Sequence, residues 1–143
     1  MTTSNFLLLD THVWLWFARG NADRLADGAR LQIEDATYQG KLAVSAITVW
    51  EIAMLEVKDR ITLGAPCEKW VANALKLPGL RLIGPEPETA IASTRLPGKF
   101  HPDPADHILV ATARALDATL STVDERIIAY GKAGYLRVYE AAR

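Results

Sequence analysis

The stretch FLLLDTHVW, from Phe6 to Trp14, predicts how the fold is built, because four apolar residues lead directly into one carboxylate, Asp10. An apolar run of this length is typical of a central strand that is buried on both faces. Asp10 would then lie at the C-terminal tip of that strand, where open α/β sheets bind ligands. We therefore expect Asp10 to belong to a functional site.

The rest of the chain alternates short apolar stretches with helical patterns. Further strands are expected over 41–45, 80–83, 118–122 and 135–140. Helices are expected over 11–20, 22–40, 46–58, 66–77 and 85–97 and after Asp103 and Asp124, with a loop over 98–104. This alternation predicts right-handed βαβ units, and so an α/β fold with a mainly parallel sheet covered by helices on both faces.

The composition narrows the class of protein. Its 143 residues, with no repeat and no linker, predict one domain over 1–143, and the only cysteine, Cys67, has no partner for an intrachain disulfide. The beginning of the chain lacks the features of a signal peptide, and no apolar stretch approaches the ~20 residues of a membrane span. We therefore expect a cytoplasmic protein with no membrane segment.

Glu51 is the second carboxylate in an unusual place. The helix over 46–58 carries an apolar stripe of Ile47, Trp50, Met54 and Leu55, with the spacing of a buried face, and Glu51 lies within it. A carboxylate on a buried face costs several kcal/mol unless a cation or hydrogen-bond donors meet it. Glu51 therefore needs a partner, which is either a metal ion or a nearby basic side chain in a structural ion pair.

Asp106 and Asp124 are each preceded by a signal for the start of a helix. Asp103 and Pro104 predict a cap and a first helical residue just before Asp106, and Asp124 follows the strand over 118–122. Helix dipole and capping are sufficient structural reasons for both acids. We expect Asp106 to start near the opposite edge of the sheet, so that the loop over 95–103 must bring it back to the acidic side.

Four carboxylates gathered at one edge would favour a divalent cation. Carboxylates a few ångströms apart raise one another's pKa unless a cation separates them. Mg²⁺ uses one or two carboxylates together with waters and substrate phosphates, which leaves room for a phosphodiester. Setting these four aside leaves 13 acidic against 16 basic residues in the rest of the chain, a balance that would suit a phosphate-backbone substrate.

Four segments in this order resemble the PIN-domain ribonucleases, in particular the VapC-type toxins of bacterial toxin–antitoxin pairs. They are LLLDTHVWLW (Leu7 to Trp16), SAITVWEIAML (Ser45 to Leu55), DPADHILVATA (Asp103 to Ala113) and ATLSTVDERI (Ala118 to Ile127). The resemblance implies a single PIN domain, with a three-layer α/β/α fold and a sheet of about five strands. It also implies a strand order that brings the four acids together.

The resemblance further implies an activity and a set of partners. Asp10 and Asp106 would be the principal ligands of Mg²⁺ or Mn²⁺, while Glu51 and Asp124 would complete the cluster and orient the hydrolytic water. The protein would be a metal-dependent endoribonuclease with RNA as its substrate. Its partners would be a VapB-type antitoxin and a second copy in a homodimer, and it would meet DNA only through the antitoxin.

Several neighbours of the acids have a structural and a functional interpretation. Thr11 and Thr122 adjoin catalytic candidates and are able to hold them by hydrogen bonds. The histidines His12, His101 and His107 fit no zinc spacing and are interpreted as ordinary polar or loop residues. Of the three, His101 is the best placed to contact RNA.

The aromatic residues Trp14, Trp16 and Phe17 are crowded into one short helix. They are too closely spaced to share one helix face, so at least one should contact something other than the sheet. Two interpretations stay open: a core group with one ordinary surface aromatic, or part of the surface that binds the antitoxin or a second copy.

Other enzyme classes fit the sequence less well. A phosphatase of the haloacid-dehalogenase type needs a second Asp two residues after the first, and position 12 is His. A dinucleotide-binding oxidoreductase needs a Gly-rich turn after the first strand, and DTHVW has none. A catalytically idle PIN scaffold that only binds a partner remains the main alternative.

Overall fold

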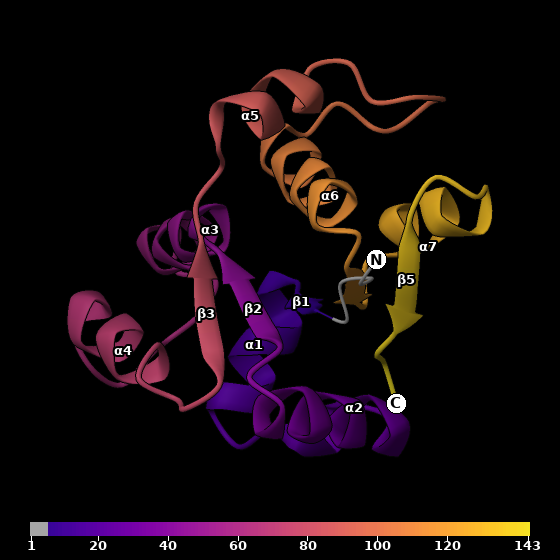
Figure 1. Cartoon of the computed structure of the whole chain (residues 1–143). Coiled ribbons are helices and arrows are strands. Elements are labelled where there is room, and N and C mark those ends of the chain that lie inside the picture. The colour runs from indigo at the N-terminus through magenta and orange to yellow at the C-terminus, as the bar shows by residue number, and fades with distance from the viewer. Residues whose placement is uncertain (1–5) are drawn as a thin grey trace.

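The computed structural model describes residues 6–143, so residues 1–5 of the expected domain lie outside the described residues. Five parallel strands form one sheet with the order β3-β2-β1-β4-β5. The strands are β1 (Leu7–Leu9), β2 (Leu42–Ser45), β3 (Leu80–Ile83), β4 (Thr119–Thr122) and β5 (Arg137–Glu140). Figure 1 shows the strong twist of this sheet, with β3 and β5 at its two edges.

Seven α-helices and one 3-10 helix connect the strands within the described part of the chain. They are α1 (Thr11–Ala18), η1 (Ala22–Arg24), α2 (Asp27–Tyr38), α3 (Ala46–Val57), α4 (Cys67–Ala74), α5 (Pro87–Ser93), α6 (Pro104–Leu116) and α7 (Glu125–Lys132). Over residues 6–143 none of these helices has both the length and the apolar character needed to cross a membrane.

The first strand lies at the centre of the sheet, as the apolar run predicts. Its side chains alternate, so Leu7 and Leu9 enter one buried cluster while Leu8 enters the other. The first cluster contains residues of α1, α2 and α3, and the second contains residues of α6 and α7. Helices therefore cover both faces of the sheet, and the expected three-layer α/β/α architecture is confirmed.

The expected helix over 22–40 is wrong at its beginning. Leu25, expected on the apolar face of that helix, forms an isolated bridge with Ala142, and the Ala26 amide donates to the Ala141 carbonyl at 2.9 Å. This pairing with the C-terminal segment holds the backbone extended, so α2 begins only at Asp27. Leu25 is still buried, but it reaches the core from outside a helix.

The apolar stripe of α3 is also not the buried face that its spacing predicts. The buried residues of this helix are Thr48 and Ile52, whereas Trp50 is 53% exposed. The stripe instead lines a groove between α3 and the beginning of α6, together with Pro104 and Ile108. The pattern correctly predicts a helix, but the apolar stripe of that helix lines an open groove and is not the face that packs into the core.

Of the three aromatic residues of α1, one is buried in the core and two are partly exposed. Trp14 is buried in the first cluster and packs edge-on against Trp70 of α4, with ring centroids 5.7 Å apart. Trp16 and Phe17 are half-buried against the same cluster. A binding surface that includes Trp14 is therefore wrong, because its ring is covered within the chain itself.

Replacing Trp14 tests this assignment to the core. Trp14→Ala is expected to lower the free energy of unfolding by about 3–5 kcal/mol, because it removes a fully packed aromatic side chain and leaves a cavity. Urea denaturation followed by circular dichroism measures the change. The control is Tyr38→Ala, which removes an almost fully exposed ring and should change stability by about 0.5 kcal/mol or less. Equal effects of the two substitutions would contradict the core assignment.

Candidate active site

The acidic site lies where the strand order changes direction, at the C-terminal ends of the neighbouring strands β1 and β4. Asp10 follows β1 and caps α1, while Asp124 follows β4 and caps α7. The Asp10 amide donates to the Ser121 carbonyl at 3.0 Å, which ties the two strand ends together. Crevices at such a point are the usual ligand sites of open parallel sheets.

Asp10 is buried and held by two donors. Its Oδ1 accepts a hydrogen bond from the Thr11 amide at 2.7 Å, and its Oδ2 accepts one from Thr122 Oγ1 at 2.5 Å. Thr122 Oγ1 also accepts from the Asp124 amide at 3.0 Å. Thr122 thus joins two of the acids, which confirms the hydrogen-bonding role predicted for it.

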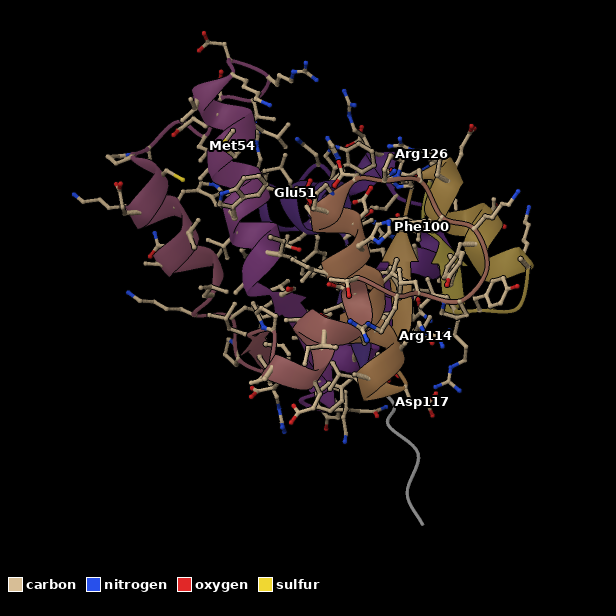
Figure 2. All side chains as sticks on the ribbon, turned by 90° about the horizontal axis from the view of Figure 1, so that it is seen from above. Glu51, Met54, Phe100, Arg114, Asp117 and Arg126 are labelled. Carbon is tan, nitrogen blue, oxygen red and sulfur yellow. The ribbon has the colours of Figure 1, made fainter. Side chains whose placement is uncertain are left out.

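Glu51 reaches the same site from the neighbouring helix α3. Its Oε1 accepts a hydrogen bond from Thr11 Oγ1 at 3.2 Å, so Thr11 contacts both Asp10 and Glu51. Burial, followed by the charge of Asp10, raises the pKa of Glu51 to about 7. Figure 2 shows Glu51 at the same end of the molecule as Arg126.

Asp106 enters from the first turn of α6, where it is buried. In a parallel α/β fold each connecting helix runs antiparallel to the strands, so α6, the helix before β4, begins at the C-terminal edge of the sheet. The expected return of Asp106 from the opposite edge is therefore unnecessary, and that step of the sequence argument is wrong. Asp103 Oδ1 accepts from the Asp106 amide at 3.1 Å, which confirms Asp103 as a helix cap.

The buried acids repel one another. Burial, followed by the charges of Asp10 and Asp103, raises the pKa of Asp106 to about 7. Burial also raises the pKa of Asp10, although the hydrogen bonds from Thr122 and Thr11 oppose this effect. At neutral pH the site therefore holds negative charge that its own hydrogen bonds do not fully stabilise.

Asp124 differs from the other acids because it has a cation beside it. Its Oδ1 accepts from the Arg126 amide at 2.8 Å, and the Arg126 guanidinium lies 3.4 Å from its Oδ2. Burial would raise the pKa of Asp124, but these contacts with Arg126 and the Ile127 amide lower it overall. Sequence reasoning missed Arg126, whose only signal is its position two residues after the acid.

His101 faces the site rather than solvent. Its Nε2 lies 2.9 Å from Asp106 Oδ2 and its side chain is 13% exposed, although the geometry is not that of a hydrogen bond. Phe100 packs against both His101 and Tyr130, which holds the loop before α6 against α7.

The other two histidines contact groups other than the four acids. The His107 ring nitrogens lie 2.9 Å from the Ser93 carbonyl and 2.5 Å from the His101 carbonyl, in a structural role. His12 is exposed and packs against Trp16.

The donor set fits a hard cation with few direct protein ligands. Among residues 6–143 no three His, Cys, Asp or Glu side chains are arranged as a ready-made metal site. Asp10 and Asp106 are nevertheless buried carboxylates that raise each other's energy when both are charged. Mg²⁺ requires only one or two carboxylates and takes its remaining ligands from water and phosphate. The four acids remain predicted site residues, and the pair fits such an ion.

The sequence of this chain matches a known family model and a known ribonuclease. Residues 7–133 match the family model described as PIN domain. Ribonuclease VapC22 of Mycobacterium tuberculosis (strain ATCC 25618 / H37Rv) is 36% identical over 127 residues, which cover 89% of this chain and 91% of that protein. The matched range of the family model spans the four segments that carry the acids.

Solved structures share the fold at low sequence identity. VapBC from Salmonella typhimurium, bound to DNA, has a TM-score of 0.65 at 16% identity and covers 94% of this chain and 97% of its own. VapBC2 from Rickettsia felis, bound to a DNA fragment from its promoter, has a TM-score of 0.63 at 16% identity, with 95% and 98% covered. FitAcB from Neisseria gonorrhoeae has a TM-score of 0.60 at 18% identity, with 94% and 96% covered.

The metal-free protein is expected to lose stability as the pH rises from about 4 to about 7. The pKa of Glu51 and that of Asp106 are each raised to about 7, so the folded protein retains protons that the unfolded chain loses from about pH 4 upward. The free energy of unfolding therefore falls across this window and levels off above it. Thermal denaturation in EDTA across the window measures the effect.

The double variant Glu51→Gln with Asp106→Asn serves as the control, because its amides do not titrate. Its melting temperature should depend less on pH than that of the wild-type protein. A wild-type melting temperature that rises with pH through the window would show that ionisation of these carboxyls does not destabilise the folded protein.

Proposed function

Because this chain belongs to the PIN-domain family, among its VapC-type members, we propose that it is an endoribonuclease that acts as the toxin of a toxin–antitoxin pair. One observation carries the proposal: Asp10 is buried beside Glu51 and Asp106, whose pKa values are raised to about 7. Carboxyls with strongly perturbed pKa values in one cleft are typical of catalytic sites. The similarity to Ribonuclease VapC22 supports RNA as the substrate.

Asp10 and Asp106 would hold the metal ion, which we propose to be Mg²⁺ or Mn²⁺. Both carboxylates are hard oxygen donors, and the fixed orientation of Asp10 between Thr11 and Thr122 suits a ligand. When bound, the ion would lower the pKa of a water and stabilise the charge on the leaving oxygen of the phosphodiester. No covalent nucleophile from the chain is required.

Glu51 and Asp124 would act on the water and the charge of the site. A carboxyl with a pKa of about 7 is able to accept a proton near neutral pH, so Glu51 is suited to orient the attacking water and take its proton. Asp124 stays ionised because Arg126 and backbone amides stabilise its charge. It would complete the negative field around the ion from the β4 side.

The proposed partners follow from the same comparisons. The solved structures that share this fold include VapBC complexes, two of them with DNA. We propose a VapB-type antitoxin as the partner of this chain, a homodimer as its assembly, and contact with DNA only through the antitoxin. The cytoplasm would be its place of action, since the RNA substrate lies there.

Removing a proposed ligand is expected to reduce RNA cleavage strongly while leaving the fold intact. Asp10→Asn and Asp106→Asn each remove a negative charge from the ion's binding position, so cleavage of a fluorogenic single-stranded RNA should fall by about 10²-fold or more, on the scale of the loss of one charge-stabilising group. EDTA should have the same effect, and added Mg²⁺ or Mn²⁺ should reverse it.

Asp23→Asn, which changes an exposed acid in η1, is the matched control and should cleave at the wild-type rate. Circular dichroism verifies the fold of each variant. Cleavage that survives EDTA or both Asn substitutions would contradict the proposed chemistry, and a wild-type protein that cleaves no RNA with either metal would indicate an idle scaffold.

Thr122→Val tests the positioning of Asp10. Valine has nearly the same shape but cannot donate to Asp10 Oδ2, so the affinity for Mg²⁺ should fall by about 10- to 100-fold. The concentration of Mg²⁺ that gives half-maximal cleavage reports this change. Thr112→Val removes a hydroxyl that donates to the Ile108 carbonyl within α6 and should leave the Mg²⁺ requirement unchanged. Equal requirements in both variants would argue against the positioning role.

A further inference from the structure

The groove along α3 runs past the proposed active site, with Glu51 part-way along it. Its walls include Glu51 and Asp103, and it forms a cavity of about 600 Å³ between α3 and the beginning of α6. The larger apolar side chains of α3 that line it are Ile47, Trp50, Met54 and Leu55. These are the residues whose spacing predicts a buried face, so the helix displays toward the groove a surface of the kind that usually forms a core.

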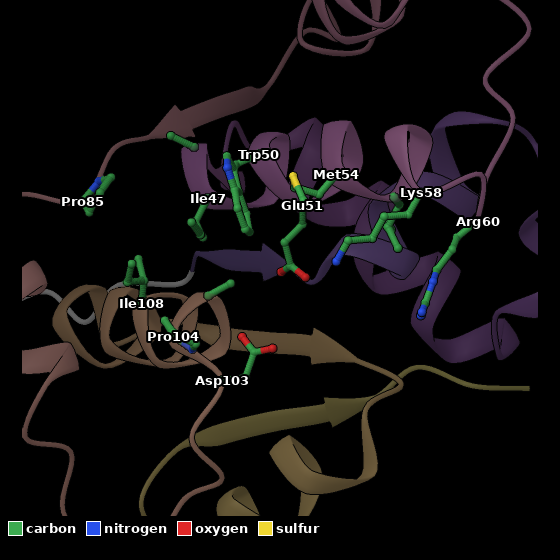
Figure 3. A pocket seen from close by; sticks show the side chains of 13 residues that line it. Ile47, Trp50, Glu51, Met54, Lys58, Arg60, Pro85, Asp103, Pro104 and Ile108 are labelled. Atoms are coloured by element: carbon green, nitrogen blue, oxygen red, sulfur yellow. The ribbon is translucent and has the colours of Figure 1, made fainter.

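Trp50 is the most prominent of these side chains. It is 53% exposed and makes no ring contact or hydrogen bond with another described residue. Figure 3 shows its indole ring lying along the groove next to Glu51. An exposed indole beside a phosphodiester-cleaving site is suited to stack on a nucleobase, because such stacking tolerates any base.

Two cations lie at the other end of the groove. Figure 3 shows Lys58 and Arg60 on the side of Glu51 opposite to Trp50. Neither side chain forms an ion pair within the described part of the chain, whereas Arg126 is engaged by Asp124. Their positive charges are therefore available to an anionic ligand.

The end of α3 is shaped so that both cations face the groove. Asp59 adopts a left-handed conformation with φ of 56°, and the Arg60 amide donates to the Leu55 carbonyl at 2.9 Å. This is the pattern of a Schellman turn, in which the chain reverses immediately after the helix. The turn brings Arg60 back beside Lys58, although an aspartate at this conformation costs energy that glycine would not.

We propose that the single-stranded RNA substrate crosses the acids along this groove, with a base stacked on Trp50 and a phosphate held by Lys58 and Arg60. This inference rests on the proposed ribonuclease function and adds the path of the strand. Trp50 lies in α3 and Lys58 is its C-cap residue, eight positions further along, or about 12 Å at 1.5 Å per residue. That is at most about four steps of a stacked strand at 3.4 Å per nucleotide.

Charge complementarity favours RNA over a protein segment as the occupant. A purely apolar peptide would cover Trp50 and Met54 but would leave Lys58 and Arg60 without anionic partners. A nucleic acid strand supplies both an aromatic face and phosphates at a regular spacing. The acids between the two ends are the point at which the scissile phosphate would lie.

The test is the kinetics of cleavage of a fluorogenic single-stranded RNA pool of random sequence by the full chain. Trp50→Ala should raise KM by about 10-fold with kcat changed by less than about 3-fold, because one stacked base is lost. Trp50→Phe should restore most of the affinity, since it keeps an aromatic face. Ile91→Ala is the matched control, because Ile91 is 55% exposed but lies outside this groove.

The cations are tested by the dependence of KM on salt. Lys58→Ala and Arg60→Ala should each reduce the slope of log KM against log salt by about 0.7, the value for one phosphate contact on a single strand. Lys69→Ala, which removes an exposed lysine of α4 outside the groove, should leave the slope unchanged.

The outcomes separate this inference from the proposed function. If the wild-type protein cleaves no RNA with Mg²⁺ or Mn²⁺, the ribonuclease proposal itself is wrong. If it cleaves RNA but the Trp50, Lys58 and Arg60 variants keep the wild-type KM and salt slope, the RNA path is overturned and a protein segment becomes the occupant of the groove. A loss in kcat alone for Trp50→Ala would also overturn it, because that would indicate a disturbed Glu51 rather than a lost contact.

Discussion

The structure depends on the confinement of mutually repelling carboxylates at one buried edge of a parallel sheet. Asp10 directly follows β1, while Glu51 and Asp106 lie in α3 and α6, and each carries a raised pKa because burial and neighbouring charge oppose its ionisation. Such an arrangement is stable only if protons, hydrogen-bond donors or a cation compensate the charge. The threonines and Arg126 supply part of this compensation, and a divalent ion would supply the rest.

Most of the fold could be predicted from local patterns. The run from Phe6 to Leu9 predicts the central strand, and Asp103-Pro104 predicts the beginning of α6 to the residue. The failures have a common cause, because the deciding contact is distant in sequence. Leu25 is not helical because it pairs with Ala142 near the other end of the chain. Trp50 is not in the core because its face of α3 lines a groove, which forms only when α3 and α6 are packed together.

In the site, too, contacts between neighbours in the sequence could be predicted, whereas contacts between residues far apart in the sequence could not. Thr11 and Thr122 could be predicted to hold acids because Thr11 is next to Asp10 and Thr122 is close to Asp124 in sequence, and both local bonds are present. The bond from Thr122 to Asp10 nevertheless joins residues that are far apart in sequence. The contact between His101 and Asp106 also depends on the packing of Phe100 against α7, which no local pattern indicates. The sequence argument expected the four acids to gather in one metal-binding pocket, with Asp10 and Asp106 as the principal ligands and Glu51 and Asp124 completing the cluster. That assignment stays a prediction, and among the described residues no three His, Cys, Asp or Glu side chains form a ready-made metal site.

The central claim is that protons and a metal ion compete for the same crowded carboxylates. The most direct measurement is isothermal titration calorimetry of Mg²⁺ or Mn²⁺ binding near neutral pH, in buffers with different enthalpies of ionisation. We predict release of up to about one proton per bound ion, falling towards zero well above pH 7, because Glu51 and Asp106 are partly protonated near their pKa of about 7. Binding without proton release near pH 7, or no binding at all, would contradict this account.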